Sequence, residues 1–186
     1  MNPTLCDKKD CTGCLACYNK CVHEAIKLVK SKEGLLYPEM ESDKCVSCGL
    51  CAKACPILNR QDRKRIKQEC YAAYVKDSKL RKKSSSGGMF SAIAEKTIKD
   101  GGYVVGACLD DNFNVKHILV DNIADLEKLR GSKYVQSFIG NVYKEVKEKL
   151  KTEKLVLFTG TPCQVAGLYS FLNKDYSNLI TVDIVC

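Results

Sequence analysis

The sequence predicts a small α+β domain organised by metal clusters, followed by an α/β domain that is truncated at its C-terminus. Three observations lead to this fold class. Residues 1–58 contain two matching runs of cysteines, residues 59–69 are polar and basic, and residues 70–186 alternate apolar strands with helical segments. With 186 residues, of which 45% are hydrophobic and 28% charged, the chain has the composition of a globular protein.

The two cysteine runs share one spacing. The first is Cys11-x2-Cys14-x2-Cys17-x3-Cys21, and the second is Cys45-x2-Cys48-x2-Cys51-x3-Cys55, followed by Pro56. This spacing is typical of bacterial-type ferredoxins that carry two 4Fe-4S clusters, in which the fourth cysteine of each run ligates the other cluster. We therefore expect residues 1–58 to form a two-cluster, ferredoxin-like domain.

Crosswise ligation assigns four cysteines to each cluster. One cluster takes Cys11, Cys14, Cys17 and Cys55, and the other takes Cys45, Cys48, Cys51 and Cys21. Zinc is the alternative, but zinc sites usually combine two separated Cys-x2-Cys pairs rather than three evenly spaced thiolates and a fourth. Val22 stands where a proline usually follows the fourth cysteine, which loosens that turn and removes no ligand.

Between the runs, the sequence predicts a hairpin. Ala25–Val29 reads as one strand, residues 32–34 as a turn, and Leu35–Tyr37 as the returning strand. Such a small domain has little core of its own. The clusters are expected to supply its organising free energy, because metal binding and folding are coupled.

Cysteine usage and the N-terminus indicate a reducing compartment. The chain starts without an apolar signal region, and no apolar run approaches the length of a membrane span. We therefore expect a cytoplasmic protein, in which thiols and clusters both persist. Outside the runs, Cys6, Cys70 and Cys108 are interpreted as plain thiols, and two further cysteines are Cys163 and Cys186.

Positive charge gathers in one segment. The chain has a net charge of +8, and residues 60–83 contain ten Lys/Arg and three Asp/Glu. This segment is either a solvated linker and surface or a docking face for an acidic redox partner, such as a ferredoxin or another subunit, or for an anionic coenzyme. Nucleic acid is a weaker option, because no binding signature is present.

Residues 70–186 are expected to form the α/β domain. The expected elements, in chain order, are a strand at Tyr71–Val75, a helix over 89–96, strands at Tyr103–Leu109 and Val115–Val120, a short helix from a cap at Asn122 to Leu129, a helix at Ile139–Lys151, a strand at Leu155–Phe158, a helix at Val165–Leu172 and a strand at Leu179–Val185. The chain ends at Cys186, directly after a strand, where a βα unit would normally continue. We therefore expect the N-terminal part of a longer protein.

Two loops of this domain are candidate cofactor sites. The first is Ser84, Ser85, Ser86, Gly87 and Gly88. Its small residues permit close approach, and the helix that follows offers free N–H groups and a positive dipole end, which bind phosphate. An ordinary helix cap explains the same residues.

The second loop is Gly160, Thr161, Pro162, Cys163 and Gln164, between an apolar strand and a helix. Loops at the carboxyl end of a sheet are where ligands bind in α/β folds. Cys163 near a helix N-terminus is a redox thiol, a cluster ligand or a small buried residue. A third stretch, residues 129–137, is polar and aromatic, and an ordinary loop explains it equally well.

Three stretches together resemble a known family. They are Ser-Ser-Ser-Gly-Gly-Met-Phe-Ser from Ser84, Arg-Gly-Ser-Lys-Tyr-Val-Gln-Ser from Arg130, and Gly-Thr-Pro-Cys-Gln-Val-Ala-Gly-Leu from Gly160. This combination resembles the beta subunits of coenzyme F-420 (deazaflavin) hydrogenase and dehydrogenase, over nearly the whole chain. Residues 70–186 would then be the N-terminal part of a catalytic domain.

The resemblance implies a flavoprotein that passes electrons between two 4Fe-4S clusters, FAD and a hydride-carrying or other redox substrate. Ser84–Gly88, Lys133, Tyr134 and the loop at Gly160–Gln164 would lie around the flavin. It also implies a possible additional cluster in a longer chain, with Cys163 and Cys186 as two ligands. The alternative function is a non-catalytic, ferredoxin-like electron carrier without flavin.

Overall fold

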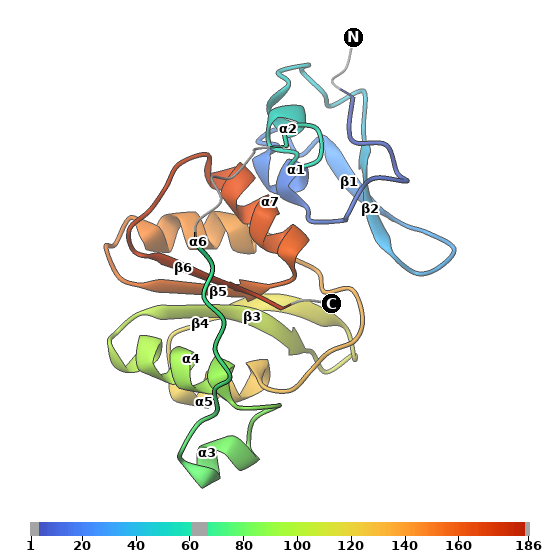
Figure 1. Cartoon of the computed structure of the whole chain (residues 1–186). Helices are drawn as coiled ribbons and strands as arrows, with labels where there is room; N and C mark the ends of the chain where they lie inside the picture. The colour runs from blue at the N-terminus through green and yellow to red at the C-terminus, as the bar shows by residue number, and fades with distance from the viewer. Residues whose placement is uncertain (1–3, 61–66, 185–186) are drawn as a thin grey trace.

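The computed structural model describes residues 4–60 and 67–184, which form a layered α/β body with the cluster region packed on one side (Figure 1). The N-terminal region contains helix α1 (Ala16–Lys20), strands β1 (Ile26–Lys30) and β2 (Leu36–Met40), and helix α2 (Leu50–Lys53). The two strands pair antiparallel, from Ile26 opposite Met40 to Lys30 opposite Leu36.

The second region is built on a mixed sheet. Its elements are α3 (Ser78–Lys82), α4 (Met89–Lys99), β3 (Tyr103–Leu109), β4 (Val115–Val120), α5 (Ile123–Leu126), the 3-10 helix η1 (Glu127–Leu129), α6 (Val142–Leu150), β5 (Val156–Gly160), α7 (Pro162–Leu172) and β6 (Leu179–Asp183). The strand order is β4-β3-β5-β6, with β3 antiparallel to β4 and parallel to β5, and β5 parallel to β6. Helices α4 and α5 cover one face, and α6 and α7 cover the other (Figure 1).

Alternating side chains of the central strands fill two cores. Val104 and Leu157 point to the core under α4, whereas Val105 and Phe158 point to the core under α6 and α7. All five residues of β5 are buried, as expected of a central parallel strand covered on both faces. The sheet is therefore a rigid platform with one layer of helices on each side.

The cluster region shares the second of these cores. Leu15 and Ala16 of the first cysteine run pack in the same apolar cluster as α6 and α7. The Asn19 amide donates to the Gly140 carbonyl oxygen at 2.9 Å, and the Lys20 ammonium donates to the Phe171 carbonyl oxygen at 3.0 Å. The small cluster region is thus stabilised by packing against the core of the α/β domain.

The hairpin, the strands expected after residue 100 and the longer helices are confirmed, with shifts of a few residues at their ends. The cap at Asn122 is also confirmed, since its side chain accepts from the Asp125 amide at 2.9 Å. The short helices α1, α2 and α3 were not expected. Part of the predicted basic linker at 59–69, and Cys186, lie outside the described residues.

The predicted strand at Tyr71–Val75 is wrong. The segment has no strand partner among the described residues, and Tyr71 is 81% exposed. It crosses the outside of the sheet domain on its way from the cluster region to α3 (Figure 1). A backbone bond to the loop before α4 runs from the Val75 amide to the Gly87 carbonyl oxygen, at 2.8 Å. The apolar residues of this segment are typical of a strand, but the segment does not join the sheet, which consists of β4, β3, β5 and β6.

Candidate iron–sulfur sites and the adjoining sheet edge

The two cysteine runs form two separate loops with the same backbone conformation. Gly13 (φ +66°) and Leu15 (φ 58°) adopt left-handed conformations on either side of Cys14. Ser47 (φ 57°) and Gly49 (φ 73°) hold the same two positions around Cys48. These left-handed turns wrap each loop so that its three closely spaced cysteines face one cavity.

Each cavity also contains the last cysteine of the other run. The cysteines lining the first cavity are Cys6, Cys11, Cys14, Cys17, Cys51 and Cys55. Those lining the second are Cys21, Cys45, Cys48 and Cys51. Cys55 thus lies with the first run and Cys21 with the second, while Cys51 borders both cavities. The assignment of individual ligands stays a prediction.

Burial favours the protonated form of two thiols of the first cavity, Cys14 and Cys17, when no cluster is bound. It raises the pKa of the Cys14 thiol to about 11 and that of Cys17 to about 12, because a thiolate loses hydration there. A thiol must lose its proton to ligate iron, so cluster binding at this cavity releases protons. Six cysteines line this cavity, and the four predicted ligands among them match the donor set of a 4Fe-4S cluster.

The first cavity lies against the α/β domain. A Cβ atom added at Gly167 of α7 would lie 3.0 Å from the Cβ of Cys14, so the two backbones approach at a point where only glycine fits. The buried Tyr143 hydroxyl lies 2.9 Å from the Cys14 carbonyl oxygen and 2.8 Å from that of Gln164, and shares its proton between them. This hydroxyl links a predicted cluster ligand to the first turn of α7.

The second cavity faces outward. Like that of the first cavity, its lining comes from the cluster region alone, here between Cys21 and Cys51. Cys48 is exposed, and the neighbouring Val46 is 58% exposed. The two cavities therefore differ in one cysteine each: Cys14 of the first packs on α7, and Cys48 of the second is exposed.

The loop Ser84–Gly88 lies at the carboxyl edge of the sheet, before α4. The Ser84 hydroxyl bonds the Leu80 carbonyl oxygen at 2.7 Å and the Ser91 hydroxyl at 2.6 Å. Ser85 and Ser86 are exposed. A Cβ added at Gly87 would lie 2.6 Å from the Ala73 carbonyl oxygen, so the close approach that this glycine permits is to the chain's own segment.

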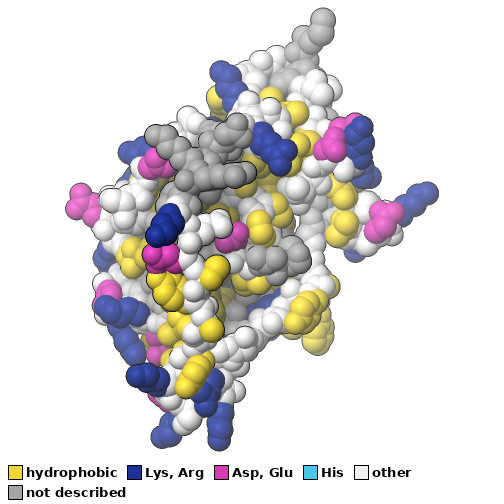
Figure 2. All heavy atoms as spheres, viewed as in Figure 1, with side chains coloured by type: hydrophobic (Ala, Val, Ile, Leu, Met, Phe, Trp, Pro, Cys, Tyr) yellow, Lys and Arg dark blue, Asp and Glu magenta, His cyan; other side chains and the backbone are white. Residues whose placement is uncertain are grey.

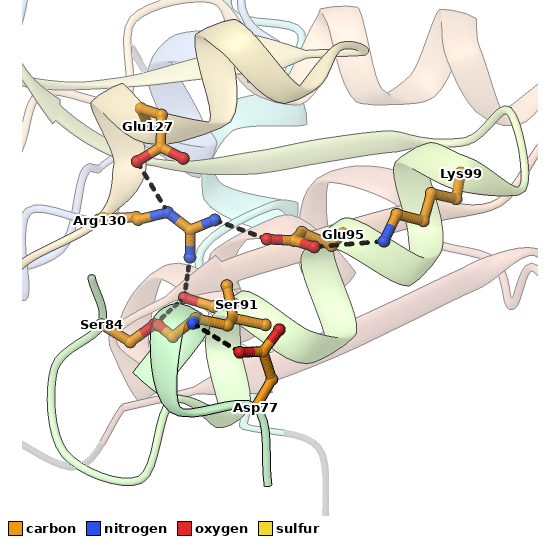
Figure 3. A network of polar contacts seen from close by, with 8 residues as sticks. Asp77, Ser84, Ser91, Glu95, Lys99, Glu127 and Arg130 are labelled. Carbon is orange, nitrogen blue, oxygen red and sulfur yellow. Dashed lines mark hydrogen bonds and ion pairs between the residues drawn. The ribbon is translucent and has the colours of Figure 1, made fainter. Parts of the chain in front are cut away.

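A nearly buried arginine ties this loop to η1 (Figure 3). Arg130 donates to the Ser91 hydroxyl, to Glu95 at 2.9 Å and to Glu127 at 3.1 Å. Its side chain is only 6% exposed, and two carboxylates offset its charge. Arg130 is therefore a structural link, because its donors are occupied within the protein.

The loop Gly160–Gln164 caps its own helix. Thr161 and Gln164 form a capping box around Pro162 at the start of α7. The Gln164 amide also donates to the Ser137 hydroxyl at 2.9 Å. The Cys163 sulfur lies 3.0 Å from the Thr161 hydroxyl.

Lys133 and Tyr134 lie on the loop that connects η1 with α6. The Lys133 ammonium donates to the carbonyl oxygens of Leu129 and Arg130, at 3.1 and 2.8 Å, and burial lowers its pKa. Tyr134 is 93% exposed. Two residues further along this loop, Gln136 and Ser137, contact the cluster region and α7. Gln136 bonds the backbone N–H and carbonyl of Leu36 in β2, and Ser137 meets α7.

Sequence reasoning missed three of these linking residues. They are Gln136, Tyr143 and Gly167. A glycine inside the otherwise apolar α7 segment was the available signal, since glycine in a helix interior usually has a packing reason. Gln136 stands in the quoted stretch from Arg130, which was given no contact with the cluster region, and no pattern in the sequence marks Tyr143.

Comparison with known families agrees with this architecture. Residues 10–58 match the family described as 4Fe-4S dicluster domain, and residues 70–144 match the family described as coenzyme F420 hydrogenase/dehydrogenase, beta subunit N-term. The chain joins these two domains. It is related to those beta subunits and contains an iron–sulfur dicluster domain.

Two curated relatives cover most of the chain. An uncharacterised protein of Methanocaldococcus jannaschii is 30% identical over 139 residues, which are 70% of this chain and 38% of the relative. A subunit of the F(420)H(2) dehydrogenase of Methanosarcina mazei is 25% identical over 165 residues, 83% of this chain and 46% of the relative. The chain thus spans less than half the length of either relative.

Among solved structures, a chain of the F420-reducing NiFe hydrogenase complex from Methanosarcina barkeri is similar, with a TM-score of 0.48 and 23% identity over 61% of this chain and 42% of that one. In the described part of the protein, every helix is too short or too polar to cross a membrane.

The sheet edge fits a flavin only in part. The first turn of α4 has no side-chain cap and lies beside the exposed Ser85 and Ser86, which suits a phosphate. The first turn of α7 is capped by its own side chains, and Lys133 is held by carbonyl oxygens. Neither cysteine-lined cavity includes any residue of the predicted flavin set.

Proposed function

We propose that the protein relays electrons through two 4Fe-4S clusters between an external carrier and the carboxyl edge of its α/β sheet. The outward-facing cavity of Cys21, Cys45, Cys48 and Cys51 holds the entry cluster. The cavity of Cys11, Cys14, Cys17 and Cys55 holds the inner one. One observation carries this order: Cys14, a predicted ligand of the first cluster, packs on Gly167 of α7, whereas Cys48 in the second cavity is exposed.

The hydrogen bonds at Tyr143 offer a short route out of the inner cluster. Its hydroxyl joins the Cys14 carbonyl oxygen to that of Gln164, which belongs to the loop at the sheet edge. Tyr143 itself stays protonated in this role, because burial raises the pKa of its phenol well above the usual value. The residue therefore positions the two loops and does not transfer its proton.

Electrons arriving at this edge would pass to FAD in the enzyme form of the proposal. A bound flavin exchanges single electrons with clusters and electron pairs with a hydride-carrying substrate. Ser84–Gly88 and the first turn of α4 would hold its phosphates, with Lys133, Tyr134 and Gly160–Gln164 around the rest. Cys163, together with Cys186 outside the described residues, would serve a further cluster in a longer chain.

A flavin-free carrier is the second candidate. The internal capping of α7 and the carbonyl contacts of Lys133 favour it, since these groups already have partners within the chain. In this form the α/β domain docks the relay onto another subunit. Both forms use a redox partner protein such as a ferredoxin, and both suit a cytoplasmic location.

The absorption spectrum of anaerobically purified protein separates these functions. Two clusters give broad brown absorption and about eight irons per chain. A further yellow absorbance, with one acid-released flavin per chain, supports the enzyme. Iron without flavin supports the carrier. A colourless protein that contains zinc would overturn both.

The phosphate part of the flavin site has its own test. Ser85→Glu places a negative charge at an exposed position beside the first turn of α4. It should lower flavin retention through charge repulsion and leave the iron content unchanged. Equal retention in wild type and variant would remove Ser84–Gly88 from the flavin site.

A further inference from the structure

The first cavity contains a thiol that the proposed clusters do not use. Cys6 lines it together with the four predicted ligands Cys11, Cys14, Cys17 and Cys55. A 4Fe-4S cluster takes one thiolate at each of four irons, so one of these five thiols is spare. Cys6 also lies before the region matched by the dicluster family, which begins at residue 10.

Backbone bonds hold Cys6 over the cavity. The amides of Asp10 and Cys11 both donate to the Asp7 carbonyl oxygen, at 3.0 and 2.9 Å, and so close a turn that folds Cys6 back beside the first run. Leu5 lines the same cavity. The position of Cys6 therefore follows from a formed turn.

Cys55 and Cys11 line the same cavity as Cys6 and are its electrostatic neighbours among the predicted ligands. The Cys6 thiol itself donates to the Asp7 carbonyl oxygen at 3.5 Å. Cys55 reaches the first cavity from the second run, just after α2, whereas the other three ligands come from the first run. Cys6 thus stands beside the one ligand of this cluster that a movement of the second loop would withdraw.

We propose that Cys6 is a reserve ligand, which binds the iron of the first cluster normally held by Cys55 when that residue is withdrawn or removed. The inference rests on the two-cluster function proposed above. In the exchange, the bond between iron and the Cys55 sulfur breaks, and the Cys6 sulfur binds the same iron. When Cys55 is withdrawn, its thiolate takes up one proton and the Cys6 thiol gives one up; when Cys55 is replaced, the Cys6 proton passes to solvent. No electron is gained or lost in either case.

The test compares four proteins, purified anaerobically and reconstituted with iron and sulfide. They are wild type, Cys55→Ala, the double variant Cys6→Ala/Cys55→Ala, and Cys17→Ala as the matched control. Cys17 is predicted to ligate the same cluster, but Cys6 is not among the electrostatic neighbours of Cys17, so Cys6 should not replace it. Wild type and Cys55→Ala should each retain about eight irons per chain, whereas the double variant and Cys17→Ala should retain about four. Equal iron loss in Cys55→Ala and in the double variant would overturn the inference.

Alkylation of the folded, cluster-loaded proteins gives an independent readout. Iodoacetamide should label Cys6 in wild type but not in Cys55→Ala, where iron occupies the sulfur; the exposed Cys70 reports on reagent access in both. Labelling of Cys6 in both proteins would overturn the inference even if Cys55→Ala kept its iron. Wild type without iron would instead contradict the proposed function itself.

Discussion

The two cluster cavities have the same loop geometry and opposite surroundings. Each loop turns on left-handed residues at equivalent positions, Gly13 and Leu15 in the first and Ser47 and Gly49 in the second. The first loop continues into the core shared with α6 and α7, while the second leaves Val46 and Cys48 exposed. The cysteine spacing determines which ligands meet, and the neighbours of each loop determine what the cluster can exchange electrons with.

The largest expected effect comes from removing a cysteine that is predicted to ligate the cluster of the other run. Cys21→Ala should remove the cluster of Cys45, Cys48 and Cys51, about half of the iron, because Cys21 lines that cavity although it belongs to the first run. Iron analysis and electron paramagnetic resonance of the reduced protein measure the loss.

A second substitution identifies which cluster was lost. Added to Cys21→Ala, Cys48→Ala should cause no further iron loss, whereas Cys17→Ala should remove the remaining iron. The reverse pattern would show that Cys21 serves its own run, and the crosswise assignment would be abandoned.

The next effect concerns the contact that sets the first cavity apart. Gly167→Ala should lower the free energy of unfolding by about 1–3 kcal/mol, because the new Cβ would lie 2.9 Å from the Tyr143 hydroxyl and 3.0 Å from Cys14. In an ordinary helix interior the same change stabilises by about 1 kcal/mol, so the sign alone is informative. Anaerobic urea unfolding measures it, and a stabilised variant would mean that the contact is loose.

Much of this architecture could be predicted from residue patterns, and the rest depended on contacts far apart in the chain. The spacing of the cysteines predicts each loop, because the first three cysteines of a run are three residues apart and meet through local turns. The apolar run at Val156–Phe158 and the cap at Asn122 are equally local. By contrast, the bond between Tyr143 and Cys14 joins residues 129 apart, and no local pattern encodes it.

The wrong strand also depends on distant contacts. Tyr71–Val75 has the composition of a strand, but a strand needs a partner, and the described sheet consists of β4, β3, β5 and β6 alone. The place of Lys133 beside a flavin stays a prediction, and its motif did not indicate that its ammonium binds the carbonyl oxygens at the end of η1.

A smaller effect should follow from removing only the hydroxyl at the first cavity. Tyr143→Phe keeps the ring, which packs against Phe158 and Phe171, and leaves the Cys14 and Gln164 carbonyl oxygens without this donor. The free energy of unfolding should fall by about 1 kcal/mol. The paramagnetic signal of the first cluster should shift, and that of the second should not. Equal shifts in both signals would argue against separate surroundings.

The smallest effect tests where a carrier docks. Basic side chains gather on α3, where Lys79, Arg81 and Lys82 are exposed (Figure 2). Helix α3 lies at the end of the molecule opposite the cluster region (Figure 1). An acidic ferredoxin that delivers electrons to the exposed second cluster would instead meet Lys53 of α2, close to Cys51.

Lys53→Glu should therefore slow reduction by an acidic ferredoxin several-fold at low salt, and the matched Lys82→Glu should change the rate by less than about twofold. Added salt should remove the difference, because charges farther apart than about 8 Å are screened at physiological ionic strength. A larger effect at Lys82 would assign docking to the basic segment and place electron entry at the α/β end. In that event the comparison between an outer and an inner cluster would have to be reversed, since the cluster beside α7 would then receive electrons first.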